Sequence, residues 1–184
     1  MRLTGAAQEE KAMKTIENTV AVSVPLRTAY DQWTQFETFP RFMSGVKRVR
    51  QQTCSVSVWV VGAGPLRQEF TVEILEQAPD SHVVWRTLGR GDLPRGEVRF
   101  RALAEDSTEV GLLVELGGRN LAGALGAVPG VAERVLGRDL IRFKYFAEGL
   151  GEATAGWRGT IRGGHVQPGM PEEAKSPTPT WPMG

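Results

Sequence analysis

Apolar and polar side chains alternate along seven short segments of this chain, and this pattern constrains the fold more than any other feature. In the first segment, residues 15–24, Ile16, Val20 and Val22 fall on one face, and Pro25 ends the pattern. The other segments are bounded by turn residues and span 46–53, 55–61, 66–77, 82–88, 96–103 and 108–116. Because these six follow one another through short turns, we expect a seven-stranded antiparallel sheet.

Helical spacing of apolar residues replaces the alternation at three places. Residues 28–36 and 39–43, directly after the first strand, are expected to form two short helices. Residues 128–150 are predicted to form one long amphipathic helix, because apolar side chains recur there every three or four positions. The sheet must bury one face, and this helix is available to cover it. The predicted class is therefore α+β, with a curved sheet around a long C-terminal helix.

Composition divides the 184 residues into three parts. Residues 1–14 are polar and without periodicity, so we expect a flexible leader. Residues 15–150 hold all the predicted strands and helices and have the size of one domain. Residues 151–184 contain seven glycines and five prolines, so this tail is expected to be mostly disordered. Within the tail, residues 156–161 carry enough apolar surface to dock back onto the domain.

A ligand cavity is expected between the sheet and the long helix. A curled sheet contacts one helix along only part of its length, and the remaining space is lined by inward-facing apolar side chains. Tyr30, Trp33, Trp59 and Trp85 could add a polar edge that orients a ligand. Twelve residues are predicted to line the cavity: Tyr30, Trp33, Phe70, Val72, Trp85, Val98, Phe100, Leu112, Val114, Val135, Asp139 and Phe143.

Several stretches of the chain are similar to one known superfamily. Residues 28–43 (TAYDQWTQFETFPRFM), 73–80 (EILEQAPD), 84–86 (VWR) and 139–144 (DLIRFK) occur in the order found in that superfamily, and residues 157–159 (WRG) look like a recurring feature of its tails. The chain thus resembles the START-like (SRPBCC) superfamily, in particular its bacterial polyketide cyclase/dehydrase and lipid-transport branch. The resemblance implies a helix-grip fold, similar to birch-pollen-allergen-like proteins, with a hydrophobic ligand cavity.

The resemblance does not imply a single activity, because relatives include lipid and ubiquinone carriers, hormone receptors, aromatase/cyclases and hydrolases. We expect binding or transport of a hydrophobic small molecule, such as a lipid, an isoprenoid or a polyketide-like compound. Each buried CH₂ group contributes about 0.8 kcal/mol, so such a ligand needs no reactive residue to bind tightly. The alternatives are a polyketide cyclase/dehydrase-type enzyme that positions a reactive chain and a protein-interaction or membrane-associated module.

The sequence assigns no catalytic residue, cofactor site or metal site. Its single cysteine, Cys54, and its two histidines, His82 and His165, do not form a metal-ligand pattern. The glycines of residues 62–64 lack the third glycine of a dinucleotide-binding fingerprint and are expected to form a hairpin turn.

Polar residues inside a cavity would mark chemistry there, and three have suitable places in the pattern. Asn18 and Gln68 fall on inward strand faces, and Asp139 lies near the apolar stripe of the long helix. Each also has a structural interpretation: Asn18 at the open end of its strand, Gln68 at the cavity mouth and Asp139 capping or paired with an arginine.

Charge and hydropathy limit the classes of partner that the chain is expected to have. The formal net charge of +1 gives no general argument for nucleic acid, and none is expected as a partner. Four basic residues without an intervening acid lie within residues 41–50, where we expect a solvated face or, alternatively, weak contact with an anionic membrane surface. The apolar residues 120–126 are either a lid or lipid-dipping loop over the cavity mouth or a buried connection. No signal peptide or membrane span is evident, so a cytoplasmic location is expected.

Overall fold

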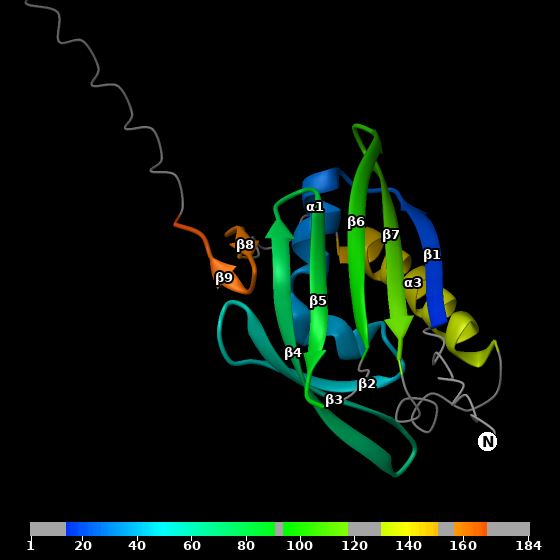
Figure 1. Ribbon diagram of the computed structural model, residues 1–184. Helices are drawn as coiled ribbons and strands as arrows, with labels where there is room; N and C mark the ends of the chain where they lie inside the picture. Colours follow the sequence, from blue (N-terminus) through cyan, green and yellow to red (C-terminus); the bar gives the residue numbers. More distant parts are fainter. Residues whose placement is uncertain (1–13, 91–93, 118–129, 151–156, 169–184) are drawn as a thin grey trace, which may run out of the picture.

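The computed structural model describes residues 14–90, 94–117, 130–150 and 157–168. The described residues form one antiparallel sheet of nine strands, seven of them in the order β1-β7-β6-β5-β4-β3-β2, which confirms the predicted α+β sheet architecture (Figure 1). These seven strands are β1 (Lys14–Val22), β2 (Val46–Gln51), β3 (Val56–Ala63), β4 (Leu66–Ala78), β5 (His82–Leu88), β6 (Arg95–Ala104) and β7 (Ser107–Leu116). Consecutive strands pair from β2 to β7, and β1 pairs with β7 at the opposite edge.

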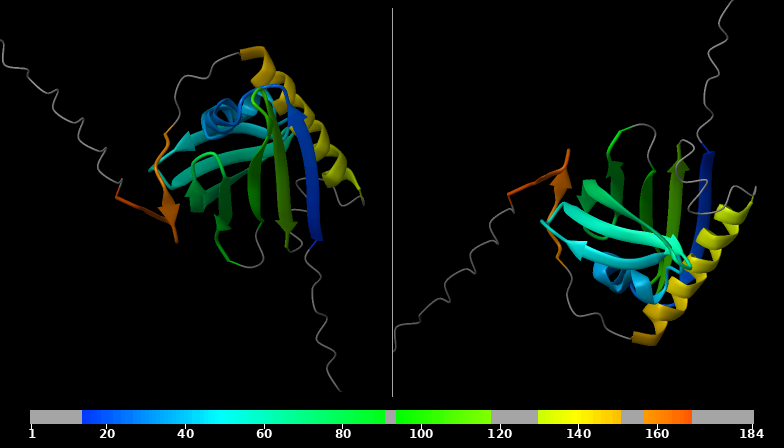
Figure 2. Two further views of the ribbon diagram at one scale, coloured as in Figure 1. Left: turned by 90° about the horizontal axis from the view of Figure 1, so that it is seen from above. Right: turned by 90° about the horizontal axis from the view of Figure 1, so that it is seen from below.

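The two short helices follow β1 as expected, with shifted bounds. α1 (Leu26–Trp33) begins directly after Pro25, and η1 (Phe36–Arg41) is a 3₁₀ helix rather than a helix over 39–43. In a 3₁₀ helix, residues three apart share a face, so Phe36 and Phe39 both point into the core. Figure 2 shows that β2 and β3 cross the other strands at a steep angle, so that the sheet curves around these helices.

The long helix α3 (Val131–Leu150) runs along the β1 side of the sheet (Figure 2). Its side chains satisfy polar groups near the edge strand: Lys144 Nζ donates to the Ala21 carbonyl at 2.9 Å, and Glu148 Oε1 accepts from Ser23 N at 2.7 Å. The helix thereby covers an edge that would otherwise expose unpaired backbone groups. No helix among the described residues is long and apolar enough to span a bilayer.

Aromatic rings fill the space where the helices meet the sheet. The Trp33 ring is at the centre of this cluster, 4.9 Å from the Phe143 ring and 5.3 Å from the Phe39 ring. Phe42 lies 5.2 Å from Phe143, so α3 and the segment after η1 share one buried surface. Edge-to-face pairs of this kind add to the free energy gained from apolar burial.

Part of the C-terminal tail returns to the domain, although the sequence suggested that most of it is disordered. β8 (Ile161–Arg162) pairs with β4 at Glu76 and Gln77, and with β9 (His165–Val166) it forms a small hairpin. The pairing is available because β4 continues beyond Glu73, where its pairing with β3 ends. The buried side chain of Ile161 anchors the hairpin.

An arginine next to this hairpin holds α1 in place. Arg158 Nη1 contacts Asp31 Oδ1 at 2.5 Å, and its Nη2 contacts Asp80 Oδ2 at 2.5 Å. Its guanidinium carbon also lies 5.3 Å from the centroid of the Tyr30 ring. Asp80 has a φ of 60° in the β4–β5 turn, a conformation that Asp adopts more readily than most residues.

Several expectations concern residues outside the described part of the chain. These are the leader up to residue 13, the stretch 120–126, the predicted helix start at 128 and the tail segments 151–156 and 169–184.

Candidate ligand-binding site

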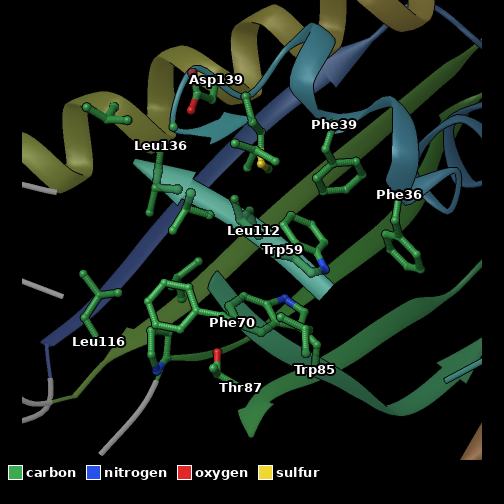
Figure 3. A pocket seen from close by; sticks show the side chains of 18 of the residues that line it. Phe36, Phe39, Trp59, Phe70, Trp85, Thr87, Leu112, Leu116, Leu136 and Asp139 are labelled. Carbon is green, nitrogen blue, oxygen red and sulfur yellow. The ribbon is translucent and has the colours of Figure 1, made fainter. Parts of the chain in front are cut away.

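A cavity of about 190 Å³ lies between the concave face of the sheet, η1 and the N-terminal half of α3 (Figure 3). One water molecule needs roughly 10–15 Å³ of such space, so the cavity can accept a ligand of many atoms. Aliphatic side chains from β4, β7 and α3 form much of the wall. Six aromatic residues also line it: Trp33, Phe36, Phe39, Trp59, Phe70 and Trp85.

The residues predicted from the sequence fall into two groups. Eight of the twelve line the cavity: Trp33, Phe70, Val72, Trp85, Leu112, Val114, Val135 and Asp139. The other four, Tyr30, Val98, Phe100 and Phe143, are buried in the packed core beside it. They do not line the cavity because α1 fills the space between the sheet and α3 at this end. The rings of Tyr30 and Phe100 lie 5.5 Å apart there.

Sequence reasoning missed the contribution of η1 and of the connection that follows it. Phe36, Phe39, Met43 and Val46 all line the cavity. The spacing of Phe36 and Phe39 signals a shared helical face, but nothing in a six-residue helix indicates whether that face meets a packed core or an open space. Trp59, which the sequence indicated as a possible polar edge of the cavity, also lies in the wall. Its indole Nε1 donates to Ser57 Oγ at 2.8 Å.

Trp85 enters the wall because its cross-strand neighbour is a glycine. Gly96 pairs with Trp85 across β5 and β6, and a Cβ atom on Gly96 would lie 2.6 Å from Trp85 Cζ2. The missing side chain therefore leaves room for the indole ring against β6.

Asp139 supplies the one carboxyl group in the wall formed by described residues, and its side chain is 4% exposed. Its Oδ1 accepts from Ser44 N at 3.2 Å and from Ser44 Oγ at 3.0 Å, and Arg142 Nη1 lies 3.5 Å away. No described residue donates a hydrogen bond to Oδ2. Thr87 provides a hydroxyl group at the opposite end of the cavity (Figure 3). A ligand here would thus meet an apolar, ring-lined space with hydrogen-bonding groups at two ends.

The remaining polar candidates lie away from this wall. Asn18 is half-buried beneath α3, with Oδ1 3.0 Å from the position of a Cβ on Gly137. Gln68 and Cys54 are exposed, Cys54 in the turn between β2 and β3. His82 is half-buried and pairs with Glu76 at 3.4 Å. Across the parts of the chain that the structure describes, no three His, Cys, Asp or Glu side chains gather in an arrangement that could hold a metal ion.

Comparisons with known proteins agree with this architecture. The family model described as "Polyketide cyclase / dehydrase and lipid transport" matches residues 22–143. An uncharacterized 17.2 kDa protein of Streptomyces lincolnensis is 42% identical over 149 residues, which cover 81% of this chain and 99% of that protein.

Solved structures show the same fold at low sequence identity. An aromatase/cyclase from Streptomyces sp. R1128 superposes with a TM-score of 0.62 at 18% identity, covering 79% of this chain and 100% of that one. A START superfamily protein from Mycobacterium smegmatis gives a TM-score of 0.58 at 15% identity, covering 76% of this chain and 97% of that one. These structures confirm the helix-grip fold, and the family model confirms the resemblance to the polyketide cyclase/dehydrase and lipid-transport branch.

Proposed function

Because this chain belongs to the polyketide cyclase/dehydrase and lipid transport family, we propose that it binds a hydrophobic small molecule in the cavity between the sheet and α3. The molecule carries one or more flat rings and at least one hydrogen-bond donor. The observation that supports this proposal is the composition of the wall, which is apolar apart from a few groups such as Asp139 and Thr87.

Burial of apolar surface supplies the affinity. Roughly 25 cal/mol is gained for each Å² of apolar surface removed from water, so a ligand of a few rings gains several kcal/mol. Six aromatic side chains in the wall favour a rigid, flat ligand, because rings stack or meet edge to face at short distances. A rigid ligand also loses less conformational entropy on binding than a flexible chain.

Asp139 supplies the selectivity. Its Oδ1 is held by Ser44, whereas Oδ2 has no donor among the described residues, so a ligand hydroxyl or amine can donate to it. A ligand that offers only acceptors at this position leaves Oδ2 of the buried carboxylate without a donor, which is unfavourable.

The test is binding of the fluorescent probe N-phenyl-1-naphthylamine, together with native mass spectrometry of the purified chain to detect a co-purified ligand. Val135→Trp places a large ring in the cavity and should lower probe affinity about tenfold or more, since the ring and the probe compete for one space. Leu103→Trp adds the same ring at an exposed position outside the cavity and should leave the affinity unchanged. A wild-type chain that carries no ligand and binds no probe contradicts the proposal.

A cyclase-type activity is the second candidate, and Asp139 is the observation that favours it. A carboxylate in an apolar cavity is suited to proton transfer from a bound chain, and proteins of similar fold are aromatase/cyclases. In that case Asp139→Asn, which keeps the size of the side chain, abolishes turnover of a polyketide-like substrate while probe binding persists. Turnover unaffected by this substitution excludes the role.

A further inference from the structure

The outer side of α3 carries a basic surface that the proposed function does not use. Between residues 131 and 149 the exposed positions are Arg134, Arg138, Ile141, Arg142, Tyr145 and Gly149. Apart from the adjacent Ile141 and Arg142, successive members lie three or four residues apart, so they form one stripe along the helix. The stripe contains three arginines and no acidic residue.

The acidic residues of α3 point elsewhere and have partners. Glu133 pairs with Lys14 at 2.5 Å, and Glu148 binds Lys144 and the Ser23 backbone. Asp139 is buried and lies 3.5 Å from Arg142. Arg134 and Arg138 therefore keep their charges available to an external partner.

Two residues from the basic stretch 41–50 extend this surface. The hydrogen bonds from Ser44 to Asp139 hold the connection between η1 and β2 against α3. At the end of η1, the Arg41 guanidinium lies 4.9 Å from the Phe146 ring centroid, and at the start of β2, Lys47 Nζ donates to the Ser44 carbonyl at 3.0 Å. Arg41 and Lys47 are both exposed. Segments almost a hundred residues apart thus contribute to one basic surface, defined here as Arg41, Lys47, Arg134, Arg138 and Arg142.

Two large side chains lie among these charges. Ile141 is 49% exposed and Tyr145 is 66% exposed, and both belong to the stripe. Basic residues next to exposed apolar and aromatic side chains are typical of helices that lie on a membrane surface, where the cations meet lipid phosphates and the apolar groups enter the interface. We propose that this face of α3 docks the chain onto a membrane that contains anionic lipids. The exposed Ile141 and Tyr145 favour a bilayer over an acidic protein, because an acidic surface offers them no apolar environment.

The experiment is co-sedimentation of the full chain with vesicles of phosphatidylcholine, with or without phosphatidylglycerol. We expect binding only to vesicles that contain phosphatidylglycerol, and weaker binding at higher salt. Each basic residue near an anionic surface contributes about fivefold in affinity, so Arg134→Gln/Arg138→Gln should reduce the partition coefficient about 25-fold. Neither residue lines the cavity, so probe binding in the same variant should stay at the wild-type level.

The matched control is Arg67→Gln/Arg162→Gln, which removes two exposed arginines from β4 and β8. Its net charge equals that of the Arg134→Gln/Arg138→Gln variant. Its binding to vesicles should change less than twofold. An equal loss in both variants shows that net charge alone drives binding and overturns the proposal. The proposal is equally overturned if wild-type protein binds neither vesicle at low salt, or if it binds polyglutamate through Arg134 and Arg138 but not vesicles, since the face then serves an acidic protein.

Discussion

The two ends of the concave sheet face carry similar apolar side chains, yet one end is packed solid and the other is hollow. At the packed end, Phe100 and Val110 of β6 and β7 are buried beneath α1. At the hollow end, Val114 and Leu116 of β7 line the cavity instead. The sheet is the same at both ends, and what differs is the element above it. The inward direction of a side chain therefore does not decide whether it meets a neighbour or an open space.

The largest expected difference between the two ends concerns truncation of a phenylalanine. Phe143 is fully buried between Trp33 and Phe42, so Phe143→Ala leaves an unfilled space in the packed end. We expect a loss of about 4 kcal/mol in the free energy of unfolding. Phe70 is half-buried and borders the cavity, so Phe70→Ala removes fewer contacts and should cost about 1 kcal/mol.

Urea unfolding followed by circular dichroism measures both values. Equal losses for the two variants would mean that the cavity is filled by side-chain motion in solution, and the distinction between the ends would fail. Probe binding should show the reverse order, since only Phe70 lines the cavity.

A smaller effect is expected from Arg158, which fastens α1 over the packed end. Its side chain is 22% exposed, and that of its partner Asp31 is 5% exposed. Among the residues that the structure describes, Arg158→Met leaves Asp31 with one cationic neighbour, the more distant Arg27 at 3.7 Å. The expected loss is about 2 kcal/mol, between the values typical of surface and of buried ion pairs. The hollow end should not respond, so probe affinity should stay within about twofold of wild type.

Arg162→Met is the control for this variant, because Arg162 is exposed on β8 only four residues away. It should change the free energy of unfolding by less than about 0.5 kcal/mol. If Arg158→Met also weakens probe binding strongly, the packed end and the hollow end are coupled. They then behave as one cooperative unit, and the contrast between them fails.

The sequence predicted the fold well because alternation and turn residues are local signals. Strand β5 has the predicted bounds, and the other strands differ from the prediction by one or two residues at their ends. The hairpin of β8 and β9 could not be predicted in the same way. Two-residue strands show no periodicity, and β8 forms only because β4 extends past β3 and offers a free edge.

The site was predictable only in part, because lining a cavity depends on contacts between distant segments and not on a local pattern. Alternation identified Val72, Leu112 and Val114, which do line the cavity, together with Val98 and Phe100, which do not. The difference depends on where α1 lies above the sheet, and this is a property of packing between distant segments. Gly96 illustrates the same limit, since its role is visible only once Trp85 is seen to occupy the space of the missing side chain.

The smallest expected effect at neutral pH, and the one that reports most directly on the packed end, comes from Tyr30 on α1. Its ring is fully buried, and its hydroxyl group makes no well-aligned hydrogen bond to a described residue, although the Gln77 side chain lies near enough to lower the phenol's pKa. Tyr30→Phe should therefore change the free energy of unfolding by less than about 1 kcal/mol. A larger loss would show that the hydroxyl group has a partner in solution.

The pH dependence distinguishes the two tyrosines of the chain. Burial raises the pKa of Tyr30 from its ordinary value of 10.0 to about 12, although Gln77 and the Arg158 charge oppose the shift. Between these two values the unfolded chain loses the phenolic proton and the folded chain keeps it, so the free energy of unfolding falls as the pH rises through this window. The loss amounts to about 3 kcal/mol, and it should disappear in Tyr30→Phe. Tyr145 is exposed, so Tyr145→Phe should keep the wild-type slope in alkaline urea titrations. If Tyr30→Phe keeps that slope as well, water reaches the Tyr30 hydroxyl, and the end of the sheet beneath α1 is less tightly packed than the structure indicates.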